Sequence, residues 1–152
     1  MNGSSSWALP AKGYPIDERK VVESSLELIE RGKFTGITDK RMHEFLYPTS
    51  YENIELRTLI HDMAGSDAKE VYLRQLRATL DRRNLKEDMR NLEVPTLFLA
   101  GAQDKIVPVA SIQRSAENCK HGFFSSVDHC GHFVPLEQPA AVNDQIEKFL
   151  AS

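Results

Sequence analysis

The hydrophobic positions of the first 92 residues follow the spacing of amphipathic helices. Val22, Leu26 and Ile29 recur every three or four residues, and Gly32 follows them as a helix stop. The same spacing predicts further helices that begin near residues 38, 50, 66–67 and 85. We therefore expect an all-helical segment over residues 16–92, preceded over residues 1–15 by a loop rich in Ser, Gly and Pro.

The pattern changes after residue 92. Residues 94–101 form a short, continuous apolar run that ends in glycine, which is typical of a strand buried on both faces of a parallel sheet. A helical pattern follows over residues 108–119, and a second strand pattern follows over residues 123–127. Pro139 then opens a last helix, whose expected buried stripe is Val142, Ile146, Phe149 and Leu150. Residues 93–152 therefore predict a β-α-β-α unit of the α/β class.

This unit holds too few strands to stand alone. A two-stranded sheet is marginally stable in water, and an apolar strand needs neighbours and cover on both faces. We therefore expect the sheet to be completed either by strands from outside this chain or by self-association.

Composition limits the classes of function. The chain has 152 residues and a net charge of −3, which gives no electrostatic case for nucleic acid or an anionic membrane as partner. No apolar run approaches the roughly 20 residues that span a bilayer, and the polar first residues lack the apolar core of a signal peptide. Two cysteines, Cys119 and Cys130, are too few for a disulfide framework, so we expect a reducing, cytoplasmic setting. Whether these two are bonded to each other stays open.

An acid and a base follow the two predicted strands. Asp104 lies just past the first strand, and His132 lies just past the second. Because the carboxyl ends of parallel strands meet at one edge of a sheet, both side chains are expected where α/β proteins hold their active sites. An acid that precedes a base is also the later part of a Ser…Asp…His order along a chain. The structural alternative is that each is an ordinary turn residue.

Residues 94–104 and 128–139 together resemble two turns of the α/β-hydrolase fold superfamily. The first segment is similar to the family's penultimate strand and acid turn, and the second to the exit of its last strand and its histidine turn. Residues 28–34 and 72–78 are similar to cap segments of small esterase- or lactonase-like members. The resemblance implies the C-terminal portion of a doubly wound α/β-hydrolase fold, with two parallel strands and flanking helices, preceded by an all-helical cap.

The resemblance makes His132 the general base and Asp104 the acid that orients it. No Gly-x-Ser-x-Gly occurs in the sequence, and Ser66, Ser125 and Ser126 do not stand on a strand-to-helix turn of that kind. We therefore expect the cap and C-terminal fragment of a cofactor-independent hydrolase of an ester, lactone or related acyl bond, which is inactive without its missing N-terminal half. If the site is completed, we expect a small-molecule acyl substrate as a further partner. The alternative is a non-catalytic binding or self-assembly module that dimerises by strand pairing or helix swapping.

A cap over this site would supply the walls of a substrate pocket. Met42, Phe45, Met63 and Tyr72 are the candidate substrate-binding residues. Core contacts between cap helices would explain the same side chains, so both interpretations stand at this point.

The histidine turn also carries potential metal ligands. His129, Cys130 and His132 are residue types that bind zinc. Their spacing in a glycine-containing turn supplies no set of four ligands, so we expect no metal. The resemblance to the hydrolase superfamily implies that no cofactor is used either.

Overall fold

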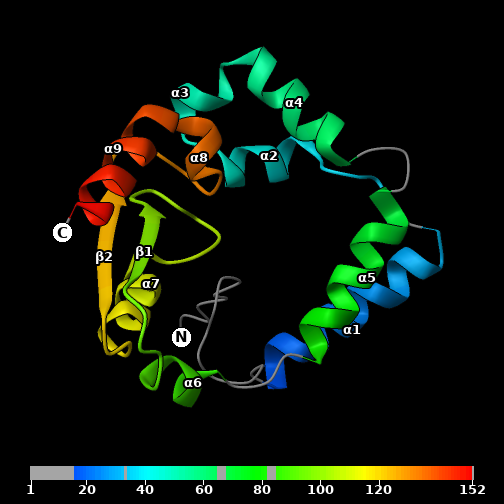
Figure 1. The fold of residues 1–152 in the computed structure, drawn as a ribbon. Helices are drawn as coiled ribbons and strands as arrows, with labels where there is room; N and C mark the ends of the chain where they lie inside the picture. Colours follow the sequence, from blue (N-terminus) through cyan, green and yellow to red (C-terminus); the bar gives the residue numbers. More distant parts are fainter. Residues whose placement is uncertain (1–15, 33, 65–67, 82–84, 152) are drawn as a thin grey trace.

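The computed structural model describes residues 16–32, 34–64, 68–81 and 85–151 (Figure 1). Its first part is helical, with the limits α1 Ile16–Glu30, α2 Asp39–Phe45, α3 Pro48–Tyr51, α4 Ile54–Ala64, α5 Ala68–Leu80 and α6 Lys86–Arg90. An alternation follows, made of β1 Thr96–Gly101, α7 Val109–Glu117, β2 Gly122–Val127, α8 Val134–Glu137 and α9 Pro139–Leu150. The α/β class is therefore confirmed, while the loop expected over residues 1–15 and the helix start expected at 66–67 lie outside the described residues.

Helices α1 and α5 pack side by side, away from the sheet (Figure 1). The apolar stripes that the spacing predicts meet here, since Val22 and Ile29 of α1 are buried against Leu73 and Leu76 of α5. Burying an aliphatic side chain of this size contributes about 1.5–3 kcal/mol, so the apolar contact holds the pair together. None of the described helices is long and apolar enough to cross a membrane.

Helices α2, α3 and α4 form a second group, whose buried side chains are Met42, Leu46, Leu56 and Ile60. Thr38 precedes α2, and its side-chain oxygen accepts the backbone N–H of Arg41 at 3.3 Å, as an N-cap residue does. The single helix expected from about residue 50 is instead divided into α3 and α4. Asn53 lies between them, and its side-chain oxygen accepts the N–H of Leu56 at 3.1 Å. This N-cap hydrogen bond starts a new helix at a point where the hydrophobic spacing alone would continue the previous one.

Strands β1 and β2 are parallel neighbours, in a register that pairs Thr96 with Gly122 and Gly101 with Val127. Helix α7 connects the two strands and packs on both of them, and α9 packs on β2. Among the described residues the sheet has only these two strands. The apolar side chains of β1 up to Leu99 are accordingly half-buried, whereas the run predicted full burial on both faces.

The end of β2 and the two helices after it share a third core cluster, made of Val127, Cys130, Val134 and Val142. Cys130 is fully buried there, so the segment between β2 and α8 is anchored in the core. The hydrophobic pattern did not predict α8, since Pro135 occupies one of its four positions. Proline in the first turn of a helix lacks only an N–H that would have no partner within the helix, so the short helix forms nonetheless.

The backbone at the end of β1 touches the backbone of the segment that follows β2. A Cβ at Gly101 would collide with the carbonyl oxygen of Gly131 and stand 2.7 Å from that of Cys130. The N–H of Ala102 donates to Val127 at 2.8 Å, and the N–H of Gln103 donates to Cys130 at 3.0 Å. Only a residue without a side chain at Gly101 allows the two loops to approach this closely.

We expect Gly101→Ala to destabilise the fold by about 3 kcal/mol, because two backbones must separate to admit the new methyl group. Gly32→Ala is the comparison, since its Cβ would meet nothing within 4 Å and only the positive φ of 90° opposes it; that cost is about 1–2 kcal/mol. Urea unfolding of both variants measures the difference. Equal decreases in the free energy of unfolding for the two variants would show that the backbone contact at Gly101 is not a tight one.

Candidate active site

Asp104 and His132 are brought together at the end of the sheet. The Nδ1 atom of His132 lies 2.9 Å from Oδ2 of Asp104, which is hydrogen-bonding distance. The Asp104 side chain is 8% exposed and that of His132 is 29% exposed, so the acid is enclosed while the ring keeps access to solvent. An ionised carboxylate accepts hydrogen bonds but cannot donate one, so the shared proton belongs to Nδ1 of His132. In a neutral ring, Nε2 is then left as a hydrogen-bond acceptor.

The loop after β1 holds the carboxylate of Asp104 in place. Its Oδ1 atom accepts the backbone N–H groups of Ile106 at 2.7 Å and Val107 at 2.9 Å. Burial by itself would raise the pKa of Asp104, but the hydrogen bond from His132 and these two amides outweigh it and hold the pKa below its usual value. The acid is therefore ionised and aimed at the ring by the geometry of its own loop.

The cap contributes directly to the position of the histidine. The backbone N–H of His132 donates to the carbonyl oxygen of Phe45, at the end of α2, at 2.6 Å. The ring of Phe45 also stacks on the imidazole, with ring centroids 5.7 Å apart and 22° between the planes. One cap residue thus fixes both the backbone and one face of the ring of the candidate base.

The other potential ligands of this segment have structural partners. His129 adopts a left-handed backbone with φ of 53°, and its Nδ1 atom lies 3.0 Å from the hydroxyl of Tyr47. Burial, together with the charges of Glu137 and Asp104, raises the pKa of the Cys130 thiol to about 12. Cys130 is therefore a protonated core residue, and neither it nor Cys119 is in a disulfide. In the part of the chain that the structure describes, no group of three or more His, Cys, Asp and Glu side chains is placed to hold a metal ion.

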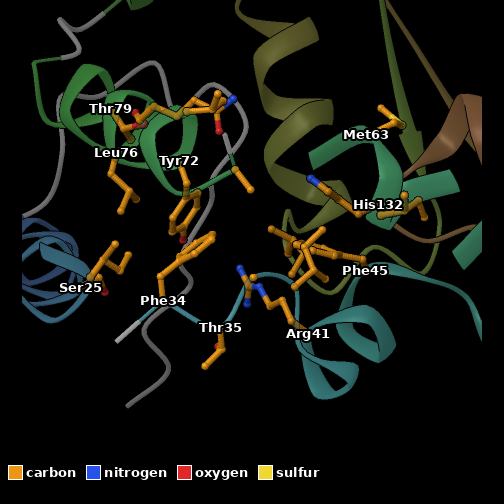
Figure 2. Close-up of a pocket in the computed structure, with 18 of the residues that line it drawn as sticks. Ser25, Phe34, Thr35, Arg41, Phe45, Met63, Tyr72, Leu76, Thr79 and His132 are labelled. Carbon is orange, nitrogen blue, oxygen red and sulfur yellow. The ribbon is translucent and has the colours of Figure 1, made fainter. Parts of the chain in front are cut away.

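His132 forms part of the wall of a cavity of about 700 Å³ beneath the cap. Figure 2 shows Phe34, Tyr72 and Leu76 on one side of this space and Phe45 and His132 on the other. Its walls are mainly apolar, and cavities of this size accommodate small organic ligands. No carboxylate of the described residues belongs to its lining, whose charged or titratable side chains are Arg41, Tyr72 and His132.

Three of the four candidate substrate-binding residues line the cavity. Phe45, Met63 and Tyr72 are among its wall residues. Met42 is not, because its side chain is 1% exposed and packs in the core of the α2–α4 group, which is the structural alternative. The helical spacing could not separate the two cases, since it places apolar residues on a face without saying whether a helix or a cavity lies opposite.

The structure adds wall residues that the sequence pattern did not single out. Phe34 packs against Tyr72 with centroids 6.0 Å apart, and the Arg41 guanidinium lies 5.0 Å from the centre of the Phe45 ring. Ser25 and Thr79 also line the cavity, but their hydroxyls donate to carbonyl groups within their own helices at 2.8 and 2.7 Å. Neither hydroxyl is therefore placed as a nucleophile bonded to His132.

A family model and two named proteins match the sequence of this chain. A family model described as alpha/beta hydrolase fold matches residues 32–139. Monoacylglycerol lipase ABHD6 from Bos taurus is 30% identical over 161 residues, an alignment that covers 98% of this chain and 48% of that protein. Protein ABHD8 from Bos taurus is 42% identical over 59 residues, which cover 39% of this chain and 14% of that protein.

Solved structures share the fold at lower identity. A thermophilic esterase from Thermogutta terrifontis superposes with a TM-score of 0.82 at 22% identity, covering 93% of this chain and 52% of that one. MenH from S. aureus superposes with a TM-score of 0.70 at 21% identity, covering 90% and 52%. The chain thus spans about half the length of these structures, and half or less of the curated relatives it matches.

We expect the stability contributed by Asp104 to depend on pH. An unfolded aspartate has a pKa of about 4, and the native pKa is lower. The contribution is therefore fully present above about pH 4 and is lost as the pH falls through the native pKa. Asp104→Asn should cost about 1.5–3 kcal/mol at neutral pH, the range for hydrogen bonds to charged groups, and much less near pH 2.

Urea unfolding of the unchanged chain and of Asp104→Asn, at both pH values, measures this difference. Asp144→Asn is the control, because Asp144 pairs with Lys148 on the surface, where its side chain is 54% exposed. Its effect should stay below about 1 kcal/mol. A cost for Asp104→Asn that does not fall with pH would contradict the assignment of an ionised, bonded carboxylate.

Proposed function

This chain belongs to the α/β-hydrolase fold family, and we propose that Asp104 and His132 are the acid and base of a site that hydrolyses an ester or related acyl bond. The 2.9 Å contact between them, with the imidazole on the wall of an apolar cavity, is the observation that carries the proposal. An isolated acid–histidine contact is common on protein surfaces. This one joins an enclosed carboxylate to a partly accessible ring at the carboxyl ends of two parallel strands.

The proposed mechanism uses the two ring nitrogens for different purposes. Asp104 accepts the Nδ1 proton, which fixes the tautomer and leaves Nε2 free to take a proton from an attacking hydroxyl. The imidazolium that forms is stabilised by the adjacent carboxylate, whose pKa is held low, so the carboxylate stays ionised at neutral pH. His132 then returns the proton to the leaving alcohol as the acyl bond breaks.

We propose further that the nucleophile is supplied from outside these 152 residues. The sequence contains no Gly-x-Ser-x-Gly, and the cavity hydroxyls of Ser25 and Thr79 donate to their own helices. The backbone amides that stabilise the oxyanion of an acyl transfer must come from the same source. The chain spans about half of its solved relatives, which leaves room for such a segment in a larger assembly.

The cavity favours an acyl group of aliphatic or aromatic character. Its lining includes Phe34, Tyr72 and Leu76 opposite the base, and transfer of apolar groups onto such walls contributes about 25 cal/mol per Å². Arg41 is the charged wall residue near Phe45, and its Nη1 atom pairs with Oε2 of Glu44 at 2.6 Å. This pairing reduces the charge that an approaching substrate meets, so a neutral ester or lactone suits the cavity.

A second candidate function is self-assembly. Among the described residues the sheet has two strands, so each strand has a neighbour on one side only. On the surface of the same unit Phe123 is 46% exposed and Leu150 is 77% exposed. Exposed edges and apolar side chains favour pairing with another chain. Sedimentation velocity at several concentrations separates the cases, because a monomer that persists at high concentration excludes assembly.

We expect the chain by itself to hydrolyse p-nitrophenyl butyrate no faster than an unrelated control protein that contains histidine. The base and its acid are present, but the nucleophile and the oxyanion-stabilising amides are not. Release of p-nitrophenol measured by absorbance tests this. Turnover that vanishes in His132→Ala would contradict the external nucleophile, because it would place a complete site within these residues.

The acid–base assignment has its own test in a chain fused behind the N-terminal half of a solved esterase relative. His132→Ala should reduce kcat of the fused protein about a million-fold, the order seen when a triad histidine is removed. His129→Ala is the matched control, because it removes a histidine of the same turn whose ring contacts the Tyr47 hydroxyl and whose carbonyl oxygen accepts from Gln138. Equal effects of the two substitutions would refute the special role of His132.

A further inference from the structure

The carboxylate of Glu137, at the end of the short helix α8, receives backbone N–H groups from three places. Its Oε1 atom accepts from Phe133 at 3.1 Å, and both oxygens lie 3.1 Å from the N–H of Gly131. Its Oε2 atom accepts from Tyr47 at 2.8 Å. Gly131 and Phe133 flank His132, whereas Tyr47 is 90 residues away in the cap. One side chain therefore joins the two segments that enclose the candidate base.

The surrounding backbone is built around this carboxylate. A Cβ at Gly131 would collide with the carbonyl oxygen of Phe45 and stand 2.9 Å from the nitrogen of Tyr47 and 3.0 Å from Oε1 of Glu137. The N–H of His132 in turn donates to Phe45 at 2.6 Å. The histidine segment and the end of α2 are thus in direct backbone contact, with the carboxylate closing the junction.

We propose that Glu137 is a positioning residue, which ties the cap to the histidine segment and so holds the imidazole at bonding distance from Asp104. The proposal rests on the proposed function, since it concerns the same acid–base pair. Residues 131 and 133 are the immediate neighbours of His132, and fixing both amides restricts the backbone angles that aim its ring. The hydrogen bonds of the Glu137 carboxylate go to backbone amides, so it acts on the ring through the main chain on either side of His132.

The chemistry of the junction calls for a carboxylate. All three groups that point at Glu137 are N–H donors, and an ionised carboxylate is an acceptor at both oxygens. Hydrogen bonds to an ionised acceptor are about twice as strong as neutral ones. A glutamine of the same shape would turn an NH2 group towards at least one of these donors, so Glu137→Gln opens the junction with little change in volume.

The test is the tautomer of His132, read from the 15N shifts of its ring nitrogens by two-bond 1H–15N NMR at a pH where the ring is neutral. The unchanged chain should show the Nδ1–H form, and Asp104→Asn should move the shifts toward the Nε2–H form. Glu137→Gln should move them in the same direction. Glu147→Gln should leave them unchanged, because it makes the same charge change on an exposed position of α9.

Amide hydrogen exchange is measured on the same samples. In Glu137→Gln the amides of Gly131 and Phe133 should exchange about tenfold faster or more, while those of Leu99 and Ser125 in the strands keep their rates. In the unchanged chain, Tyr47, Gly131 and Phe133 should share similar protection, because one acceptor holds all three. This second measurement needs no variant and decides the matter even when Glu137→Gln does not fold.

Each outcome points one way. A Nδ1–H tautomer that survives in Glu137→Gln, or a Tyr47 amide about a hundredfold less protected than those of Gly131 and Phe133, overturns the positioning role and leaves the acid–base pair intact. An unchanged chain whose His132 is mainly the Nε2–H form refutes the pair itself, and with it the proposed function. A tautomer shift in Glu137→Gln without one in Glu147→Gln supports the proposal.

Discussion

The close approach of two backbones, at the end of β1 and in the segment after β2, is the constraint on which the rest of the site depends. Gly101 carries no side chain at this contact, so its backbone can lie against the carbonyl groups of Cys130 and Gly131, and the amides of Ala102 and Gln103 reach carbonyl groups of the second segment. Asp104 follows Gly101 by three positions and His132 follows Gly131 by one. The distance between acid and base is therefore decided first by how closely the main chains can approach, and only then by the side chains.

The carboxylate of Asp104 binds amides of its own loop and also orients the His132 ring. One carboxylate oxygen accepts the amides of Ile106 and Val107, which leaves the other facing His132. A group held in this way does not have to reorganise when charge develops on the ring, which is the condition for electrostatic stabilisation at low cost. The lowered pKa of Asp104 has the same origin, since the ring and the two amides favour the ionised form more than burial opposes it.

The cap is part of the site as well as its cover. The carbonyl oxygen of Phe45 accepts the His132 amide and its ring stacks on the imidazole, while the Arg41 guanidinium lies 5.0 Å from the centre of the same ring. A shift of α2 must therefore move both a wall of the cavity and the support of the base. This coupling gives a physical route by which a ligand in the cavity can alter the geometry of the acid–base pair, and it makes the cap helices relevant to chemistry as well as to substrate fit.

Much of the fold follows from local patterns in the sequence. Helix spacing places Val22, Ile29, Leu73 and Leu76 on the faces that meet between α1 and α5, and the apolar run after residue 92 identifies β1. Asp104 and His132 could be singled out because polar residues after apolar strands are expected at one edge of a parallel sheet. Their roles as acid and base were predicted from the resemblance of residues 94–104 and 128–139 to the acid and histidine turns of the family.

The remainder was decided by tertiary structure, because it depends on contacts between segments far apart in the chain. Met42 and Phe45 share a helix and a similar apolar character, yet one packs in the core and the other faces the cavity. The proposed role of Glu137 depends on Tyr47, 90 positions away. The contact is to the backbone amide of Tyr47, so the residue type at position 47 gives no sign of it. The sequence pattern predicted the helical segment, both strands and the positions of Asp104 and His132 after them, but neither α8 nor the division between α3 and α4. The folded chain decided which backbone groups those side chains meet, since every residue type offers the same N–H and C=O and only folding brings a given pair together.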